Sequence, residues 1–247
     1  MAYADRYEFV GDPERADVPT SELLSDDYAA GQRERIDPDS AASWPIESGL
    51  DRQAADTTTF HITDGSGDAA AVTTSLGGQF LVVGDTGIHI NERMNYMSLD
   101  EDNVNVVAPG ATVRHTSNPY MVLRDGVPYL MGGNTGIDTQ PQGQLQQFIN
   151  VVEFGMSAQE AVAQARFVST AFPASNYPYA VDNTLQVESG FSNSAVNSLR
   201  DRGHNVVVGA GIFGTANMIV VTEDGADAQV GVEPRNETAS GVVRPID

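Results

Sequence analysis

From residue 57 onward, apolar and polar residues alternate in short runs separated by turn-forming residues, which is the pattern of β-strands. The alternation predicts strands at residues 57–63, 69–76, 87–91, 120–124, 127–131, 205–208, 217–222 and 227–232. Asp125 and Gly126 separate two of these runs and predict a two-residue hairpin turn. Strands therefore dominate this part of the chain.

Apolar residues also recur at helical spacing between the strand groups. Leu145, Phe148, Ile149 and Val152 share one face of a predicted helix over residues 142–154, and a second helix is expected at 158–168. A third is expected at 192–202, with Gly203 as its stop. Strands, a helical layer and strands again favour a layered α+β sandwich over a doubly wound sheet.

The first 50 residues differ from the rest, because they are polar and interrupted by prolines. One helix is expected there, over residues 21–35, in which Leu23, Leu24 and Tyr28 share a face. The composition predicts an arm rather than a separate domain.

The charge balance is strongly acidic, with 13 Lys+Arg against 34 Asp+Glu, a formal charge of -21 and an isoelectric point near 4.2. All of the basic residues are arginine. A surface of this sign excludes nucleic acid as a partner. At molar salt the Debye length falls to about 3 Å, so that carboxylates repel one another less. The composition therefore indicates a halophilic protein of a high-salt cytoplasm, with an ordinary acidic protein as the alternative.

Several kinds of site are disfavoured by what the chain lacks. It has no cysteine, which excludes disulfides and thiolate sites, and no lysine, which excludes a phosphate-binding Walker loop. Its apolar runs are too short to cross a membrane. The four histidines have no paired spacing typical of a metal site, and the acidic run at residues 100–102 lacks the glycine of a calcium loop. We expect no metal and no membrane.

Residues 209–214 match the glycine pattern of a dinucleotide-binding loop. Such a loop must open a helix, whereas residues 215–221 have the composition of a strand. A flexible connection between strands is the better interpretation, and no cofactor is expected.

The junction between Asp56 and Thr57 carries the candidate chemistry. A threonine hydroxyl needs a base beside it, and a free α-amino group on the same residue can serve, since its pKa is near neutrality. Cleavage between Asp56 and Thr57 would create that pair.

Other short stretches, spread along the chain, identify the context of this junction: Tyr3-Ala4-Asp5-Arg6, Gly11-Asp12-Pro13, Gly87-Ile88-His89-Ile90-Asn91, Phe154-Gly155-Met156, Ala165-Arg166-Phe167 and Glu233-Pro234-Arg235. With them, the chain from about Ala2 to its C-terminus resembles the C-terminal part of the γ-glutamyltransferase family. These enzymes are N-terminal-nucleophile (Ntn) hydrolases that cleave themselves into two subunits. A divergent branch is indicated by Ser98-Leu99-Asp100, Ala108-Pro109-Gly110, His115-Thr116-Ser117-Asn118-Pro119 and Gln140-Pro141-Gln142.

The resemblance implies a four-layer αββα sandwich and a set of catalytic roles. Thr57 becomes the nucleophile, its freed amine the base, and Ser75 the hydroxyl that orients it. Gly132 and Gly133 become the backbone donors to the oxyanion, for which preorganised N–H groups are required.

The residues implied for substrate binding depart from the family pattern. The family's asparagine falls at Gly77, its glutamine at Arg93, its ammonium-binding aspartate at about Tyr96, and its paired serines at His115 and Thr116. Loss of a carboxylate that pairs with a buried ammonium is costly, so a γ-glutamyl head group should bind poorly. The resemblance also implies three extra residues between Gly133 and Gln140.

We therefore interpret residues 57–247 as the small-subunit domain and residues 1–56 as a remnant of the large-subunit portion. The favoured function is hydrolysis of an amide or peptide substrate, or acyl transfer, through Thr57. The missing large-subunit portion, or a second chain, is the expected partner. The alternative is a truncated family member that only binds a partner chain.

Overall fold

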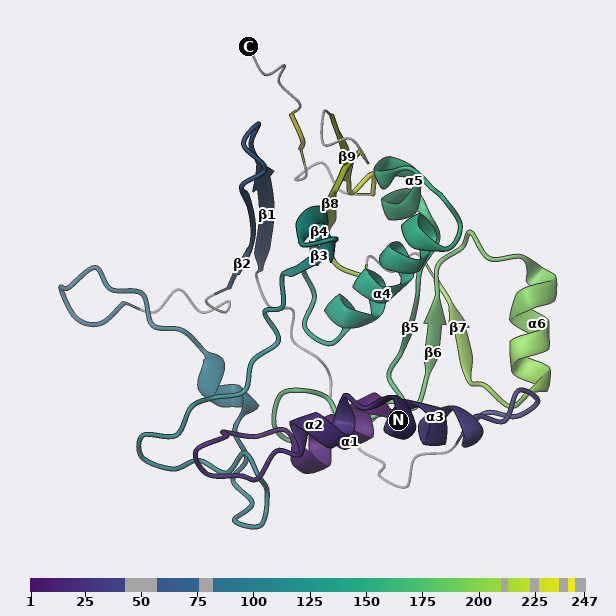
Figure 1. Cartoon of the computed structure of the whole chain (residues 1–247). Helices are drawn as coiled ribbons and strands as arrows, with labels where there is room; N and C mark the ends of the chain where they lie inside the picture. Colours follow the sequence, from purple (N-terminus) through teal and green to yellow (C-terminus); the bar gives the residue numbers. More distant parts are fainter. Residues whose placement is uncertain (43–56, 76–81, 210–212, 223–226, 236–239, 243–247) are drawn as a thin grey trace.

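The central sheet of this computed structural model contains four antiparallel strands. They are β3 (Tyr120–Arg124), β4 (Val127–Asn134), β8 (Ala216–Val221) and β9 (Ala228–Val232), in the order β3-β4-β8-β9. The structure describes residues 1–42, 57–75, 82–209, 213–222, 227–235 and 240–242 (Figure 1). Leu130, Met131 and Met218 are almost fully buried in this sheet, which makes it the centre of the core.

The turn between β3 and β4 forms as predicted. Asp125 and Gly126 both have positive φ, 53° and 83°, as a type I′ hairpin requires. The register of the pair shifts between Val122 and Leu123, which is a β-bulge.

Two helices cover one face of the central sheet (Figure 1). They are α4 (Thr139–Val152) and α5 (Ala158–Ala163), and Ser157 caps α5 in a reciprocal pair with Glu160. The helix expected at 158–168 is too long in the prediction, because residues 167–169 form a strand. Gln164 is extended, with ψ of 145°, which ends the helix before the buried Arg166.

A two-stranded hairpin packs against the other face of the central sheet. It consists of β1 (Thr58–Thr63) and β2 (Ala69–Thr74). Thr59 is buried toward the sheet, whereas Phe60 and Ile62 on the outer face are 45% and 58% exposed. The α+β class is confirmed, and the described residues build three of the four layers expected, namely a helical layer and two β layers.

A second sheet lies beside the helical layer (Figure 1). It contains β5 (Phe167–Ser169), β6 (Leu185–Val187) and β7 (Val206–Val208), and α6 (Asn193–Asp201) connects the parallel pair β6 and β7. Strands β5 and β6 were not expected. The helix α6 begins at its Ser192 cap and is followed by Gly203 with positive φ, as predicted.

The N-terminal region packs closely on this body. The helix α1 (Ala2–Phe9) was not expected, and the single helix expected at 21–35 is divided into α2 (Thr20–Leu23) and α3 (Asp26–Glu34), because Ser25 caps the second. The Arg6 guanidinium forms an ion pair of 2.6 Å with Asp138, and the Tyr3 ring stacks on Phe172. The first helix is thus fixed to the fold and is no loose arm.

The strand expected near His89 does not form as a strand. The strand expected at 87–91 reduces to one bridge between Val82 and His89. In the described ranges, no helix is long and apolar enough to cross a membrane.

Candidate active site

Thr57 lies directly before β1, and its hydroxyl Oγ1 donates a hydrogen bond of 3.0 Å to the hydroxyl Oγ of Ser75. The hairpin explains this meeting, because Thr58 is paired with Thr74 across the two strands. The neighbouring residues Thr57 and Ser75 therefore face one another at the open end of the hairpin. The expected nucleophile and its expected orienting hydroxyl are brought together. Asp56 and Gly77 lie outside the described residues.

The hydrogen bonds continue from Ser75 into the short 3-10 helix η1 (Arg93–Tyr96). One terminal nitrogen of the Arg93 guanidinium donates to Ser75 Oγ, and the other donates to the Tyr96 hydroxyl over 2.9 Å. The Tyr96 hydroxyl lies 3.3 Å from Thr116 Oγ1. Five predicted site residues are thus joined by side-chain hydrogen bonds into one group, which we call the Thr57 hydroxyl network. Its members are Thr57, Ser75, Arg93, Tyr96 and Thr116. His115 is exposed beside Thr116 in the sequence.

Gly132 and Gly133 do not fit the oxyanion role expected for them. Gly132 pairs with Tyr120 of β3 and Met218 of β8, and Gly133 pairs with Asn217 of β8. In an antiparallel sheet, successive N–H groups of a central strand point to alternate neighbours. The pairing therefore uses both N–H groups within the sheet.

Close packing explains these two glycines instead. A Cβ atom on Gly132 would lie 2.5 Å from the Tyr120 ring, and one on Gly133 would lie 2.2 Å from Thr59 Oγ1. Both positions allow neighbouring side chains to approach the β4 backbone. The resemblance pointed to strand β4, but the two N–H groups that it assigned to the oxyanion lie within the hydrogen-bonded part of that strand.

The turn that follows β4 offers a more suitable backbone. Gly136 and Ile137 both have positive φ, 107° and 50°, and they lie after the bond from Thr135 N–H to Thr215 C=O. Their N–H groups have left the ladder at the start of α4. Sequence reasoning missed this turn, although Gly136 shortly before Gln140-Pro141-Gln142 was the available signal.

A buried polar group lies between the hairpin and β4. Thr59 Oγ1 donates to the Val72 carbonyl over 3.2 Å and lies 3.4 Å from His61 Nε2. Asn217 donates to the Thr59 carbonyl over 3.2 Å. Burial lowers the pKa of His61 to about 4, so its ring is neutral at pH 7.

A hollow of about 370 Å³ opens beside these residues, which is large enough for a small ligand. Its walls come from β1, from the end of β4, from β8 and β9 and from residues 240–242, and they include Thr57, Thr59, His61, Thr135, Thr215 and Asn217. The candidate nucleophile is therefore accessible from a concave surface. The described residues include no group of three His, Cys, Asp or Glu side chains that could hold a metal ion.

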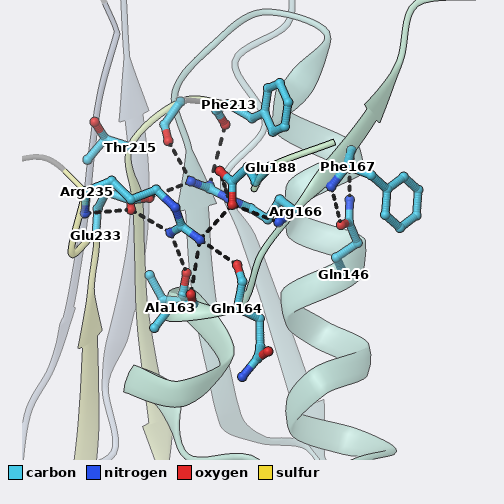
Figure 2. Close-up of polar contacts among 12 residues, drawn as sticks. Gln146, Ala163, Gln164, Arg166, Phe167, Glu188, Phe213, Thr215, Glu233 and Arg235 are labelled. Atoms are coloured by element: carbon cyan, nitrogen blue, oxygen red, sulfur yellow. Dashed lines mark hydrogen bonds and ion pairs between the residues drawn. The ribbon is translucent and has the colours of Figure 1, made fainter. Parts of the chain in front are cut away.

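The segment before β8 borders the same site and is held by a buried ionic network (Figure 2). Arg166 donates to the carbonyls of Phe213 and Gly214 over 3.5 and 3.3 Å and to Glu233 over 2.8 Å. Arg235 in turn forms ion pairs of 2.8 Å with both Glu188 and Glu233. The strand β8 begins at Ala216, so the glycine pattern at 209–214 leads into a strand, as expected.

The network reaches the turn after β4 through Gly214. A Cβ atom on Gly214 would lie 1.8 Å from the Thr135 carbonyl, so that only glycine allows this approach. Thr215 N–H also donates to Thr135 Oγ1 over 2.8 Å. The ionic network is thereby connected to the backbone next to Gly136.

A threonine at the start of a β-hairpin on a layered α+β body is the arrangement of the N-terminal-nucleophile hydrolases. A family model described as Gamma-glutamyltranspeptidase matches residues 1–243. The chain belongs to the γ-glutamyltranspeptidase family.

Relatives and solved structures agree with this assignment. The chain is 33% identical over 247 residues to the glutathione hydrolase-like YwrD proenzyme of Bacillus subtilis (strain 168), covering 97% of the chain and 45% of that protein. It is 29% identical over 210 residues to the oxamate amidohydrolase proenzyme of Klebsiella pneumoniae, covering 84% and 38%. The crystal structure of cephalosporin acylase from Bacillus halodurans superposes with a TM-score of 0.81 at 28% identity, covering 97% and 42%. The chain therefore spans less than half the length of these proteins.

Proposed function

We propose that Thr57 is the nucleophile of an amide hydrolase or acyltransferase and that cleavage of the Asp56-Thr57 bond activates it. The observation that carries this proposal is the 3.0 Å hydrogen bond from Thr57 Oγ1 to Ser75 Oγ at the start of β1. This contact holds the hydroxyl at the hollow, where a substrate carbonyl has access to it. The names of several relatives contain the word proenzyme, which agrees with activation by cleavage.

Activation begins with attack of Thr57 Oγ1 on the carbonyl carbon of Asp56. The peptide C–N bond breaks, the Thr57 nitrogen takes the proton, and an ester joins the two residues. Water then hydrolyses the ester, which leaves a carboxylate on Asp56 and a free amine on Thr57. That amine has a pKa near neutrality and can accept the Oγ1 proton in later turnovers.

Each turnover then follows the same chemistry on a substrate amide. Thr57 Oγ1 attacks the amide carbon, and the amine passes the proton to the leaving nitrogen. The acyl group remains on Thr57 as an ester until water or an acceptor amine removes it. The Gly136 N–H in the turn after β4 lies outside the ladder and is suited to stabilise the oxyanion, whereas the Ile137 N–H lies 3.3 Å from the side-chain oxygen of Gln140 in the amide orientation that satisfies both groups.

The substrate class differs from a γ-glutamyl compound in this proposal. Tyr96, which stands at about the place of the ammonium-binding aspartate, is buried and carries no negative charge to pair with an ammonium group. Relatives of this chain include proteins named Acylase ACY 1 proenzyme and oxamate amidohydrolase proenzyme, and neither name refers to a γ-glutamyl compound. We therefore favour a small non-γ-glutamyl amide.

A second candidate function is binding of a partner chain without catalysis. Phe60 and Ile62 expose apolar surface on the outer face of the hairpin, where the fourth layer of the sandwich is expected. A large-subunit portion or a second chain would cover this face. We also propose that residues 1–56 are a remnant of the large-subunit portion and that residues 57–247 are the small-subunit domain.

Mass spectrometry of the purified chain tests the catalytic proposal. Wild-type protein should release fragments 1–56 and 57–247, Thr57→Ser should cleave more slowly, and Thr57→Ala should remain intact. Thr58→Ala is the matched control, because Thr58 is the exposed neighbour of Thr57 and should still permit cleavage. A wild-type chain that stays intact over days with a native circular dichroism spectrum would favour the partner-binding alternative.

A further inference from the structure

Arg93 is a cation in the candidate active site whose partners are neutral hydroxyl groups. The chain has 34 acidic residues for 13 arginines, so a carboxylate partner would be easy to supply. Arg6, Arg15, Arg166 and Arg235 all have one. Arg93 has no ion pair with any carboxylate among the described residues, and its guanidinium donates to the hydroxyl groups of Ser75 and Tyr96.

The guanidinium is held in place and still has donors to offer. An arginine side chain carries five N–H donors in a planar fork, and the two hydrogen bonds leave the others available. The Tyr96 ring, which is buried, lies 5.4 Å from the Arg93 carbon Cζ, and this contact restricts the position of the fork. Arg93 itself is only partly buried, so a small ligand can reach it.

The Arg93 guanidinium lies close to the candidate nucleophile. Ser75 Oγ accepts from both Thr57 and Arg93, so the guanidinium is two hydrogen bonds from the nucleophilic oxygen. Two hydrogen bonds span at most about 6 Å. A reacting carbonyl carbon lies about 3 to 3.5 Å from the nucleophile, so a group bound by Arg93 must be only a few bonds from that carbon.

We propose that Arg93 binds a carboxylate on the acyl part of the substrate. The substrate class is then the half-amide of a short dicarboxylic acid, in which a free carboxylate lies one to three carbons from the amide carbonyl. This inference rests on the proposed function, because it assumes that Thr57 attacks that amide. A planar guanidinium suits a carboxylate through two parallel hydrogen bonds, and it repels the ammonium group of an amino-acid substrate.

A different role for Arg93 would be to position Thr57 through Ser75 without touching the substrate. The two roles predict different selectivity. A positioning residue changes the rate for every amide, whereas a carboxylate-binding residue changes only the preference for charged over neutral acyl groups.

Binding to uncleavable protein provides the first test. Thr57→Ala protein would be titrated with succinate, glutarate and neutral butyramide at constant ionic strength, by chemical-shift perturbation. We expect succinate or glutarate to bind at least about 10-fold more tightly than butyramide, since hydrogen bonds between charged groups are the stronger ones. Adding Arg93→Gln should abolish this preference, Arg93→Lys should retain part of it, and Arg33→Gln on exposed α3 should leave it unchanged.

Turnover by processed protein provides the second test. Arg93→Gln should lower kcat/KM for an N-succinyl anilide about 10-fold or more, mainly through KM, and should change kcat/KM for the N-butyryl anilide little. Equal losses for both anilides would overturn the proposal in favour of positioning through Ser75. Equal binding of dicarboxylate and butyramide to the Thr57→Ala protein would overturn it as well.

The binding test also separates this inference from the proposed function. A dicarboxylate preference that depends on Arg93, in a chain that never cleaves itself or an amide, supports the anion site and refutes Thr57 catalysis. Cleavage at Asp56-Thr57 without any dicarboxylate preference supports Thr57 and refutes the anion site.

Discussion

Arg166 and Glu233 form an ion pair of 2.8 Å between side chains that are only 2% and 0% exposed. Burial lowers the pKa of Arg166, and the charge of Glu233 acts in the opposite direction. Both groups are held by further hydrogen bonds from or to the backbone (Figure 2). The two positive charges of Arg166 and Arg235 are paired with the two negative charges of Glu188 and Glu233. Removing any one of the four would leave an unpaired charge in the network.

Removal of one charge from this pair should strongly destabilise the protein. Glu233→Gln leaves Arg166 buried beside one fewer carboxylate, and breaking a buried pair in this way costs about 3–5 kcal/mol. Urea unfolding should show this loss, whereas the exposed control Glu101→Gln should change the unfolding free energy by less than about 0.5 kcal/mol. Glu233→Asp keeps the charge and should lose less. Equal stability of Glu233→Gln and wild type would mean that the network contributes little.

Local patterns predicted the parts of the fold that depend on local interactions. The hairpins β1-β2 and β3-β4 follow from alternation and from the turn at Asp125 and Gly126, and α6 follows from its cap and stop. Strands β5 (Phe-Val-Ser) and β6 (Leu-Gln-Val) have three residues each and no continuous apolar run, whereas β7, which is equally short, was found through its run Val206-Val207-Val208. Helix α1 is fixed by distant contacts such as Arg6 with Asp138, and no local pattern reports those.

The candidate site was predictable to a similar extent. The resemblance identified the residues of the Thr57 hydroxyl network, and the structure brings them together. It could not show that the N–H groups of Gly132 and Gly133 belong to the ladder, because strand pairing is a long-range property. The partnership of Arg93 with Ser75 also required the three-dimensional arrangement.

Gly133→Ala tests the packing role that we assign to this glycine. The added Cβ atom would lie 2.2 Å from Thr59 Oγ1 and 3.1 Å from His61 Cε1, so the hairpin must move away from β4. Overpacking of this kind costs about 1–3 kcal/mol, which thermal unfolding would detect.

The double variant Thr59→Ala with Gly133→Ala provides the control. It removes the oxygen that the new methyl group would meet, so the double variant should lose less stability than the two single losses added together. Strict additivity would show that the contact with Thr59 is not the cause.

His61 should make stability depend on pH between about 4 and 6.5. Burial lowers its pKa from 6.5 to about 4, so the unfolded chain takes up a proton at a higher pH than the folded protein does. The contribution is complete above pH 6.5, declines as the pH falls, and is lost below the folded pKa. A shift of this size corresponds to about 3 kcal/mol.

The His61→Gln variant isolates this effect from the titration of the carboxylates. The unfolding free energy of wild type should fall more between pH 7 and pH 4 than that of His61→Gln, by up to about 3 kcal/mol. His115→Gln, in which an exposed histidine is replaced, should follow the wild-type curve. Parallel curves for wild type and His61→Gln would show that His61 titrates normally.

Salt should stabilise the protein over a wide range, because its formal charge is -21. At 0.1 M salt, repulsion between carboxylates acts over about 10 Å, and at 1 M it acts over about 3 Å. The unfolding free energy of a domain is only about 5–15 kcal/mol, so relief of this repulsion is a substantial fraction of that free energy. The melting temperature should therefore rise steeply between about 0.1 M and 2 M KCl.

The triple variant Asp100→Asn, Glu101→Gln and Asp102→Asn, in an exposed loop, removes part of the negative charge and should weaken the dependence of the melting temperature on salt. A melting temperature that stays constant across this range would contradict the halophilic interpretation, and equal slopes for wild type and the triple variant would show that these loop charges have no part in it.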